Sequence, residues 1–169
     1  SAIQLTTVKY ALDLDFDTAL NDLFNQLVEK YMPEISKNKS LSDSDVWQKK
    51  YKEYFEKLNI AGRLVKHTLQ TNNDEFQFDK SWKNDIWHCY QPISFALQDK
   101  DAIKDKVYRW FGKLKELQSA DEKLHLTFLT ASSKSHKDLD DFIKEYLTFK
   151  DGTLRTEIIK ENDAKIFAK

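Results

Sequence analysis

The spacing of hydrophobic residues changes between residues 63 and 131, and this change limits the fold more than any other feature of the chain. Three runs, "RLVKHTLQ", "EFQFDKSW" and "IWHCYQPISFAL", are strand-like, and the segment 100–117 then has hydrophobic residues at helical spacing. The following run, "KLHLTFLTAS", is hydrophobic on both faces. Alternation with a period of two is typical of strands, and a period of about 3.6 is typical of helices. The pattern therefore predicts three strands, an amphipathic helix and a buried strand.

Similar patterns on either side predict further elements. Asp15 or Asp17 can cap a helix that Pro33 ends, and the polar segment "EISKNKSLSDSD" is typical of an exposed connector. A second helix follows with its hydrophobic stripe from Trp47 to Leu58, and Ser135 with Asp138 predicts a capped helix later in the chain. A short helical tail is expected at the end. The predicted strands lie near residues 3–12, 63–70, 75–80, 87–97, 124–131 and 154–160.

The composition fits a single folded domain. Hydrophobic residues make up 40% of the 169 residues, enough for a core, and only three glycines and two prolines interrupt the chain. We expect the α/β (α+β) class, with a central mixed sheet flanked by helices. One domain would span 1–169, with a core at about 43–160 and a strand-plus-helix extension at 1–42. A fragment of a longer protein would have the same appearance.

Charge and cysteine content limit the classes of partner and compartment. The 27 basic and 28 acidic residues nearly cancel, so the chain lacks the strongly basic surface typical of nucleic-acid-binding proteins. The single cysteine, Cys89, cannot form an intramolecular disulfide, and its aromatic neighbours predict a buried thiol. No hydrophobic run is long enough to cross a membrane. We expect a cytoplasmic protein without a membrane partner.

The predicted order of elements over residues 43–130, α-β-β-β-α-β, resembles the core of the PD-(D/E)XK nuclease superfamily. This resemblance implies a divalent metal held by an acid on one strand and by an acid, followed two residues later by a lysine, on the next strand. Asp79 stands at about the first position. In the next strand Gln91 replaces the second acid, Ile93 stands where lysine is required, and Lys104 or Lys106 would have to substitute for it. The resemblance therefore implies a degenerate fold without catalysis.

A second resemblance is carried by "ALDLDFDTALNDLFNQLV", "FQFDKSW" and "YQPISFALQDKDAIKDKVYRWFGKL". These runs are similar to the carboxy-terminal half of an uncharacterised family of bacterial and prophage proteins, over about residues 11–117. The family has no catalytic signature. The resemblance implies a mobile-element context more than a mechanism.

Other candidate chemistry has weaker support. The four histidines form no short-range pair and are expected to lie on separate faces, and His88 and Cys89 are adjacent in a strand, so they should point to opposite faces. The loop "TASSKSHKD" lacks the glycines of a phosphate-binding loop and is interpreted as a capping loop. We predict no resident cofactor, and magnesium only if the chain is a nuclease.

Basic residues gather on two predicted helices, close to aromatic residues that could stack on bases. The aromatic candidates are Trp47, Tyr51, Trp82 and Trp87. The candidate nucleic-acid-binding residues are Lys49, Lys50, Lys52, Lys57, Lys104, Lys106, Arg109 and Lys113.

The sequence therefore predicts a non-catalytic nucleic-acid-binding domain of a bacterial mobile-element or phage-conflict protein. The first alternative is a protein-interaction or immunity-type module that binds no nucleic acid. The second is a metal-dependent nuclease that uses Asp79, Gln91, Lys104 and Lys106. The oligomeric state stays open.

Overall fold

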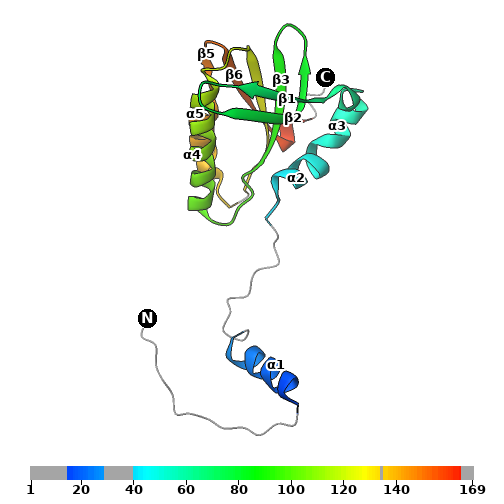
Figure 1. Cartoon of the computed structure of the whole chain (residues 1–169), viewed down its shortest axis with the longest axis vertical. Helices are drawn as coiled ribbons and strands as arrows, with labels where there is room; N and C mark the ends of the chain where they lie inside the picture. Colours follow the sequence, from blue (N-terminus) through cyan, green and yellow to red (C-terminus); the bar gives the residue numbers. More distant parts are fainter. Residues whose placement is uncertain (1–14, 29–39, 134, 165–169) are drawn as a thin grey trace. The chain divides into compact units, whose positions relative to one another are not determined.

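The computed structural model describes residues 15–28, 40–133 and 135–164 (Figure 1). The chain divides into two units, Ser1–Lys39 and Ser40–Lys169. In the first unit the described element is one helix, α1 (Phe16–Leu27). Asp15 caps it, because its carboxylate accepts hydrogen bonds from the Asp17 and Thr18 N–H groups at 3.1 and 3.3 Å. The predicted cap is thus confirmed, whereas the strand expected near residues 3–12 lies outside the described residues.

The second unit contains a sheet and its covering helices. A helical segment comes first and consists of α2 (Asp43–Val46), a π-helical turn (Trp47–Tyr51) and α3 (Lys52–Lys57). The later helices are α4 (Lys100–Leu117) and α5 (Asp140–Leu147). The strands are β1 (Val65–Gln70), β2 (Glu75–Lys83), β3 (Trp87–Ser94), β4 (Leu124–Ala131), β5 (Lys150–Asp151) and β6 (Leu154–Lys160). Short 3-10 turns cover Ala61–Arg63, Lys137–Leu139 and Glu161–Asp163.

The sheet is mixed and has the strand order β1-β2-β3-β4-β6-β5. The pairs β1–β2 and β2–β3 are antiparallel, whereas β3, β4 and β6 run parallel. The two-residue β5 pairs with the beginning of β6. The predicted class, a mixed sheet flanked by helices with the order α-β-β-β-α-β, is confirmed.

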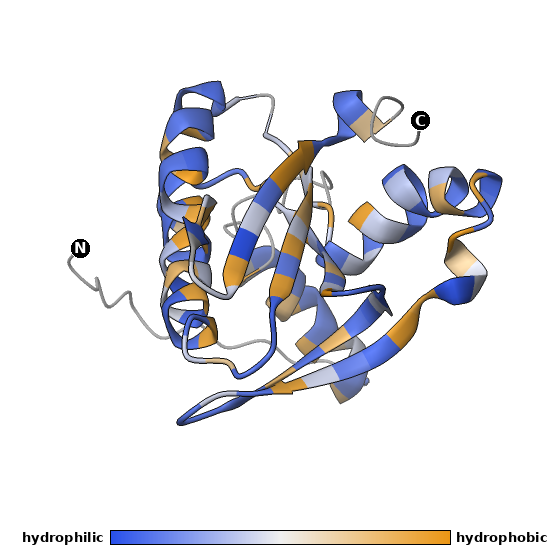
Figure 2. Cartoon of the chain, turned by 90° about the horizontal axis from the view of Figure 1, so that it is seen from above, coloured by the Kyte–Doolittle hydropathy of each residue, from blue (hydrophilic) through white to orange (hydrophobic). Residues whose placement is uncertain are grey.

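Helices pack on both faces of the sheet, and each face has its own hydrophobic core. Leu126 and Phe128 of β4 belong to the core under α4 and α5, while Leu129 and Ala131 belong to the core under α2, the π-helical turn and α3. Alternation along β4 therefore supplies both cores, as expected of a strand buried in the middle of a sheet. The strands in Figure 2 accordingly carry hydrophobic residues along their length.

The bounds predicted for the helix 100–117 and for the strands 124–131 and 154–160 are confirmed. The helix predicted with its hydrophobic stripe from Trp47 to Leu58 is present as the helical segment Asp43–Lys57, but it is not a regular α-helix. A π-helical turn interrupts it, and such a turn adds a residue that helical spacing does not reveal. The predicted cap at Ser135 was wrong, because α5 begins after a 3-10 turn and Leu139 precedes it without a side-chain cap.

Candidate functional site

A cleft forms where β2 separates from β3. β2 pairs with β1 from Gln70–Glu75 up to Val65–Ser81, but its pairing with β3 runs only from Lys83–Trp87 to Ser81–Cys89. The first half of β2 therefore pairs with β1 alone, and this part of the β1–β2 hairpin separates from β3. The space that opens has a volume of about 490 Å³ and is closed on one side by α4. Its lining residues are Asp43, Asp74, Glu75, Phe76, Gln77, Phe78, Gln91, Lys106, Arg109, Trp110 and Lys113.

The direction of the β3 backbone groups explains the position of Pro92. The N–H groups of Trp87 and Phe95 donate to the carbonyls of Lys123, directly before β4, and of Ala131, its last residue. Odd-numbered N–H groups of β3 therefore point toward β4, and even-numbered ones point toward the side that β2 has left. Pro92 is even-numbered and has no N–H, so it leaves no donor unsatisfied there. Proline is tolerated at this position because β3 is locally an edge strand.

Side chains bond to three backbone groups of this local edge. The Ser94 N–H donates to Asp43 Oδ1 at 2.7 Å, and the Ser94 carbonyl accepts from Lys106 Nζ at 3.0 Å. Lys106 Nζ also contacts Asp43 Oδ1 at 2.5 Å. The two members of one ion pair therefore satisfy the N–H and the carbonyl of Ser94. The Gln91 side-chain amide donates to the Pro92 carbonyl at 3.0 Å. Ser94 itself is fully buried.

The four nuclease candidates do not form one site. Gln91 and Lys106 both line the cleft, and both bond to the backbone of β3. Asp79 is not among the lining residues. It is exposed, and its pKa lies below the ordinary value, mainly because the Gln77 amide donates to it at 3.0 Å and also because Lys66 is near. Lys104 lies 3.7 Å from Asp101 in its own helix.

Asp43 is one of the cleft residues that sequence reasoning missed. It occupies the first position of α2, after Ser42, which forms a capping box with Asp45. The Ser-x-x-Asp pattern was visible and marks a helix start. Its partners Ser94 and Lys106 are 51 and 63 positions away in the chain, and local spacing cannot reveal such contacts.

The candidate nucleic-acid-binding lysines of the first helical segment are each close to a carboxylate. Three are near acids four residues away in the same segment, and the fourth is near Glu161. The nitrogen–oxygen distances are 2.6 Å for Lys49–Asp45, 2.9 Å for Lys50–Glu161, 3.7 Å for Lys52–Glu56 and 2.6 Å for Lys57–Glu53. This surface therefore has alternating charges, which provide little attraction for a phosphate backbone.

The four aromatic candidates are engaged inside the protein. Trp47 and Tyr51 are buried in the core under the first helical segment. Trp82 stacks on His88 with 4.7 Å between ring centroids, and Trp87 stacks on His67 at 3.6 Å. Trp47 and Tyr51 are therefore unavailable to bases, and the half-buried Trp82 and Trp87 each have one ring face occupied by a histidine.

Two cations of α4 in the cleft, Arg109 and Lys113, lack the carboxylate neighbours that the lysines of the first helical segment have. Arg109 Nε donates to the Asp105 carbonyl one turn earlier at 3.4 Å, and Lys113 Nζ lies 4.7 Å from the Trp110 ring. Neither cation has a carboxylate partner within 4 Å in the described part of the chain. Asp74 and Glu75 line the opposite wall, so the cleft carries both signs of charge.

The histidines correct one expectation. His88 and His125 are paired in register on β3 and β4, with 5.5 Å between ring centroids, so the prediction that they lie on separate faces was wrong. The pKa of each lies below its ordinary value, mainly because burial disfavours the charged ring. His125 Nε2 lies 3.5 Å from Glu157 Oε2. Within residues 15–28, 40–133 and 135–164 no group of three or more metal-ligating residues is close enough to hold an ion.

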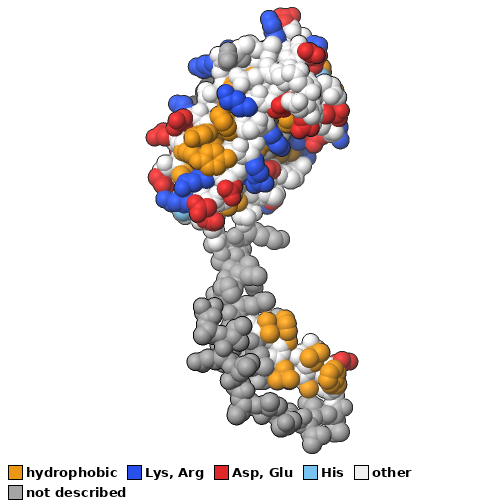
Figure 3. All heavy atoms as spheres, turned by 60° about the vertical axis from the view of Figure 1, so that its left-hand side comes forward, with side chains coloured by type: hydrophobic (Ala, Val, Ile, Leu, Met, Phe, Trp, Pro, Cys, Tyr) orange, Lys and Arg blue, Asp and Glu red, His pale blue; other side chains and the backbone are white. Residues whose placement is uncertain are grey.

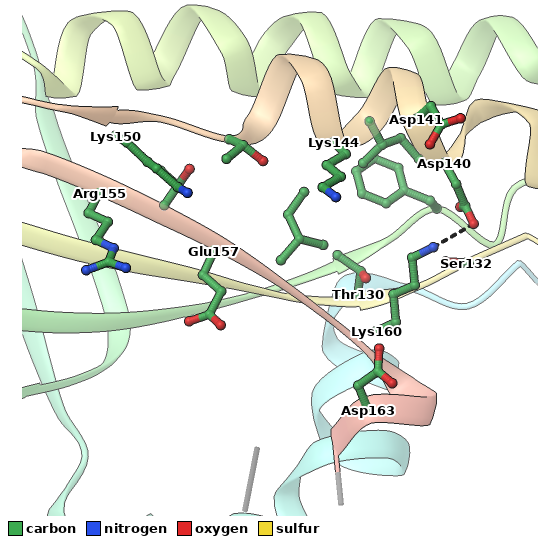
Figure 4. Close-up of a pocket in the computed structure, with 15 residues that line it drawn as sticks. Thr130, Ser132, Asp140, Asp141, Lys144, Lys150, Arg155, Glu157, Lys160 and Asp163 are labelled. Carbon is green, nitrogen blue, oxygen red and sulfur yellow. Dashed lines mark hydrogen bonds and ion pairs between the residues drawn. The ribbon is translucent and has the colours of Figure 1, made fainter. Parts of the chain in front are cut away.

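A second cavity, of about 470 Å³, lies near the carboxyl ends of the parallel strands, beside α5 (Figure 4). Phe95, Thr130 and Ser132 contribute to it from the segments at the ends of β3 and β4, and Lys160 pairs with Asp140 at 2.6 Å. Its charged lining is balanced, with four acids and four bases: Asp140, Asp141, Glu157, Asp163, Lys144, Lys150, Arg155 and Lys160. The loop interpreted as a capping loop thus borders a pocket of mixed charge.

No described helix is long and hydrophobic enough to cross a membrane. No family model, curated protein or solved structure matches this chain. The resemblance to a prophage protein family and the nuclease-like interpretation therefore stay predictions.

Proposed function

We propose that this protein is a non-catalytic binding domain whose partner is another protein. The observation that carries the proposal is the use of Asp43, Gln91 and Lys106 to satisfy the local edge of β3. These are the polar groups that a nuclease-like site in the cleft would need. Freeing Lys106 for chemistry would leave the Ser94 carbonyl without its bond, and an unsatisfied buried polar group costs about 1–3 kcal/mol.

A protein partner explains the surface charges better than a nucleic acid does. The lysines of α3 and of the π-helical turn before it have carboxylate neighbours, and the aromatic candidates are engaged. Recognition of the phosphate backbone depends on unpaired cations, which release bound counterions.

The helix α1, considered by itself, also favours a protein partner. Its large hydrophobic side chains are exposed at positions spaced four, three and one residues apart: Phe16, Leu20, Leu23 and Phe24. It contains Asp17 and Asp22 and no basic residue. An acidic amphipathic helix of this kind fits a hydrophobic groove flanked by basic side chains. We assign it that role.

Nucleic-acid binding is the second candidate, and one observation favours it. Arg109 and Lys113 are exposed in the cleft and have no carboxylate partner in the described residues. Under this alternative a nucleic-acid backbone would pass along α4. The cleft also contains Asp74 and Glu75, which would repel phosphates.

Fluorescence anisotropy with labelled single-stranded and duplex DNA and RNA, at low and moderate salt, separates the two candidates. We expect no saturable binding at either salt concentration. Binding whose affinity falls steeply with salt, and falls further in an Arg109→Gln/Lys113→Gln variant but not in Lys57→Gln, would establish the nucleic-acid alternative.

The protein partner is tested through α1. A host protein captured by the chain should be purified and should bind again in isolation, and Leu20→Asp or Phe24→Asp should abolish that binding. Asn21→Asp, which adds the same charge to α1 outside the hydrophobic stripe, should preserve it. Equal loss in all three variants, or binding that ignores all three, would contradict the role of α1.

A further inference from the structure

The outer surface of α4 carries a regular stripe of exposed residues. Asp101, Asp105, Tyr108, Gly112 and Lys115 are all exposed, and they are spaced four, three, four and three residues apart. This spacing averages 3.5 residues, the repeat of a helix that packs along a second helix. The core-facing side of α4 is separate and consists of Ile103, Val107, Leu114 and Leu117.

An aromatic patch surrounds the middle of this stripe. Tyr108 is 48% exposed and packs edge-on against Phe142 and Tyr146 of α5, with ring centroids 5.5 and 5.4 Å apart. Phe111 contacts Tyr146 at 5.3 Å. α4 and α5 lie side by side (Figure 1), and with this side turned forward Figure 3 shows hydrophobic side chains gathered among charged ones. A hydrophobic patch with a charged rim is typical of an interaction surface.

Gly112 lies in the middle of α4, where no contact in the described part of the chain explains a glycine. A Cβ added there would meet no atom within 4 Å, so no neighbour in the described structure requires its absence. Glycine in a helix interior costs about 1 kcal/mol relative to alanine. A glycine on an exposed helix surface, one turn after Tyr108, would however allow the side chain of a second helix to approach closely.

The stripe is complementary to itself when it is reversed. Asp105 and Lys115 lie equally far on either side of Trp110, and so do Tyr108 and Gly112. Two antiparallel copies of α4 related by a two-fold axis would therefore place each Tyr108 over the Gly112 of the other copy. The same arrangement brings each Asp105 to the other Lys115.

The charges at the ends of this stripe have no intrachain ion pair. Asp105 has no basic partner within 4 Å in the described residues. Lys115 Nζ lies over the rings of Phe111 and Phe149, at 5.5 and 5.3 Å, and likewise has no carboxylate partner there. Both are available to a second copy.

We propose that the chain forms a two-fold symmetric homodimer through the α4–α5 face, with the two α4 helices antiparallel. The aromatic patch supplies the buried centre, Gly112 permits close approach and the two Asp105–Lys115 pairs fix the direction. The net charge of −1 opposes association only weakly. This surface is distinct from the cleft and from α1.

Sedimentation velocity over a wide range of protein concentration tests the proposal. We expect a monomer–dimer equilibrium that Tyr108→Lys abolishes. Asp105→Lys and Lys115→Asp should each weaken association by about tenfold or more, and the double variant should restore it, because the swapped charges again meet their opposites across the two-fold axis. Glu53→Lys on α3, on the other face of the sheet, is the matched charge reversal and should leave association unchanged.

Gly112→Ala is an independent test, because it should stabilise the monomer and weaken the dimer. The variant should raise the melting temperature of the dilute monomer, because alanine favours the helix, yet it should weaken the dimer by adding a methyl group under Tyr108. A wild-type chain that stays monomeric at every concentration would overturn the proposal. A double charge variant that fails to recover association, or a Gly112→Ala variant that strengthens it, would do the same.

Discussion

The carboxylate of Asp43 accepts a hydrogen bond from the Ser94 N–H at 2.7 Å, across 51 positions of the chain. This bond joins the first turn of α2 to the last residue of β3, at the place where β2 no longer covers that strand. At this edge a side chain, and not another strand, bonds to the backbone of β3. Lys106 of α4 bonds to the Ser94 carbonyl and pairs with Asp43.

Removal of the Asp43 carboxylate should destabilise the fold. Asp43→Ala leaves the buried Ser94 N–H without an acceptor and Lys106 without its counter-ion, and we expect the free energy of unfolding to fall by about 1–3 kcal/mol. Asp43→Asn keeps an acceptor oxygen and should cost less. Urea denaturation measures both, and a loss in Asp43→Ala no greater than that in Asp43→Asn would contradict the role of this bond.

The nuclease alternative predicts metal-dependent cleavage, and we expect none. Single-stranded and duplex DNA and RNA incubated with magnesium or manganese should stay intact, because Asp79 does not line the cleft that contains Gln91 and Lys106. A gel assay measures this. Cleavage that disappears in Asp79→Ala and Lys106→Met, but persists in Lys104→Met, would establish the nuclease alternative.

Stability should fall as the pH drops below about 6.5, the ordinary pKa of histidine. The folded-state pKa values of His88 and His125 are lowered, mainly by burial, so below that pH the unfolded state binds protons that the folded state does not. The lost stability should level off once the pH passes below the folded-state values.

Urea midpoints at about pH 7.5 and about pH 5.5 measure this effect. His125→Asn removes one of the two histidines and should reduce the difference between the two midpoints. The double variant His88→Asn/His125→Asn should reduce it further. A difference that is unchanged in the double variant would assign the pH dependence to other groups.

The Cys89 thiol should be unreactive in the folded protein. It is fully buried, the Ser81 hydroxyl lies 3.2 Å from its sulfur, and burial raises its pKa to about 11. Since the thiolate is the reactive form, a chromogenic disulfide reagent at mildly alkaline pH should react only after denaturant is added. Rapid labelling of the folded chain, at the rate of the unfolded one, would show that the strand opens around Cys89.

Local periodicity was sufficient to predict the helix 100–117 and the strands 124–131 and 154–160. The reason is that each has a hydrophobic pattern along its own length, and α4 needs no distant partner to present Ile103 and Val107 on one side. Asp15 was likewise recognisable as a cap, because the N–H groups that it accepts from are two and three residues away. The spacing of the α4 stripe can also be found in the sequence, but only the structure shows that these residues are exposed.

The candidate site depended on contacts between distant residues, so the tertiary structure alone decided it. Asp43 meets Ser94 and Lys106 because β2 leaves β3, and His88 meets His125 because β3 and β4 pair in one particular register. Strand register and the departure of a hairpin are set by packing across the whole sheet, whereas residue spacing reports only what each segment does along its own axis. For that reason the sequence identified Gln91 and Lys106 as candidates but could not reveal that both bond to the backbone of β3.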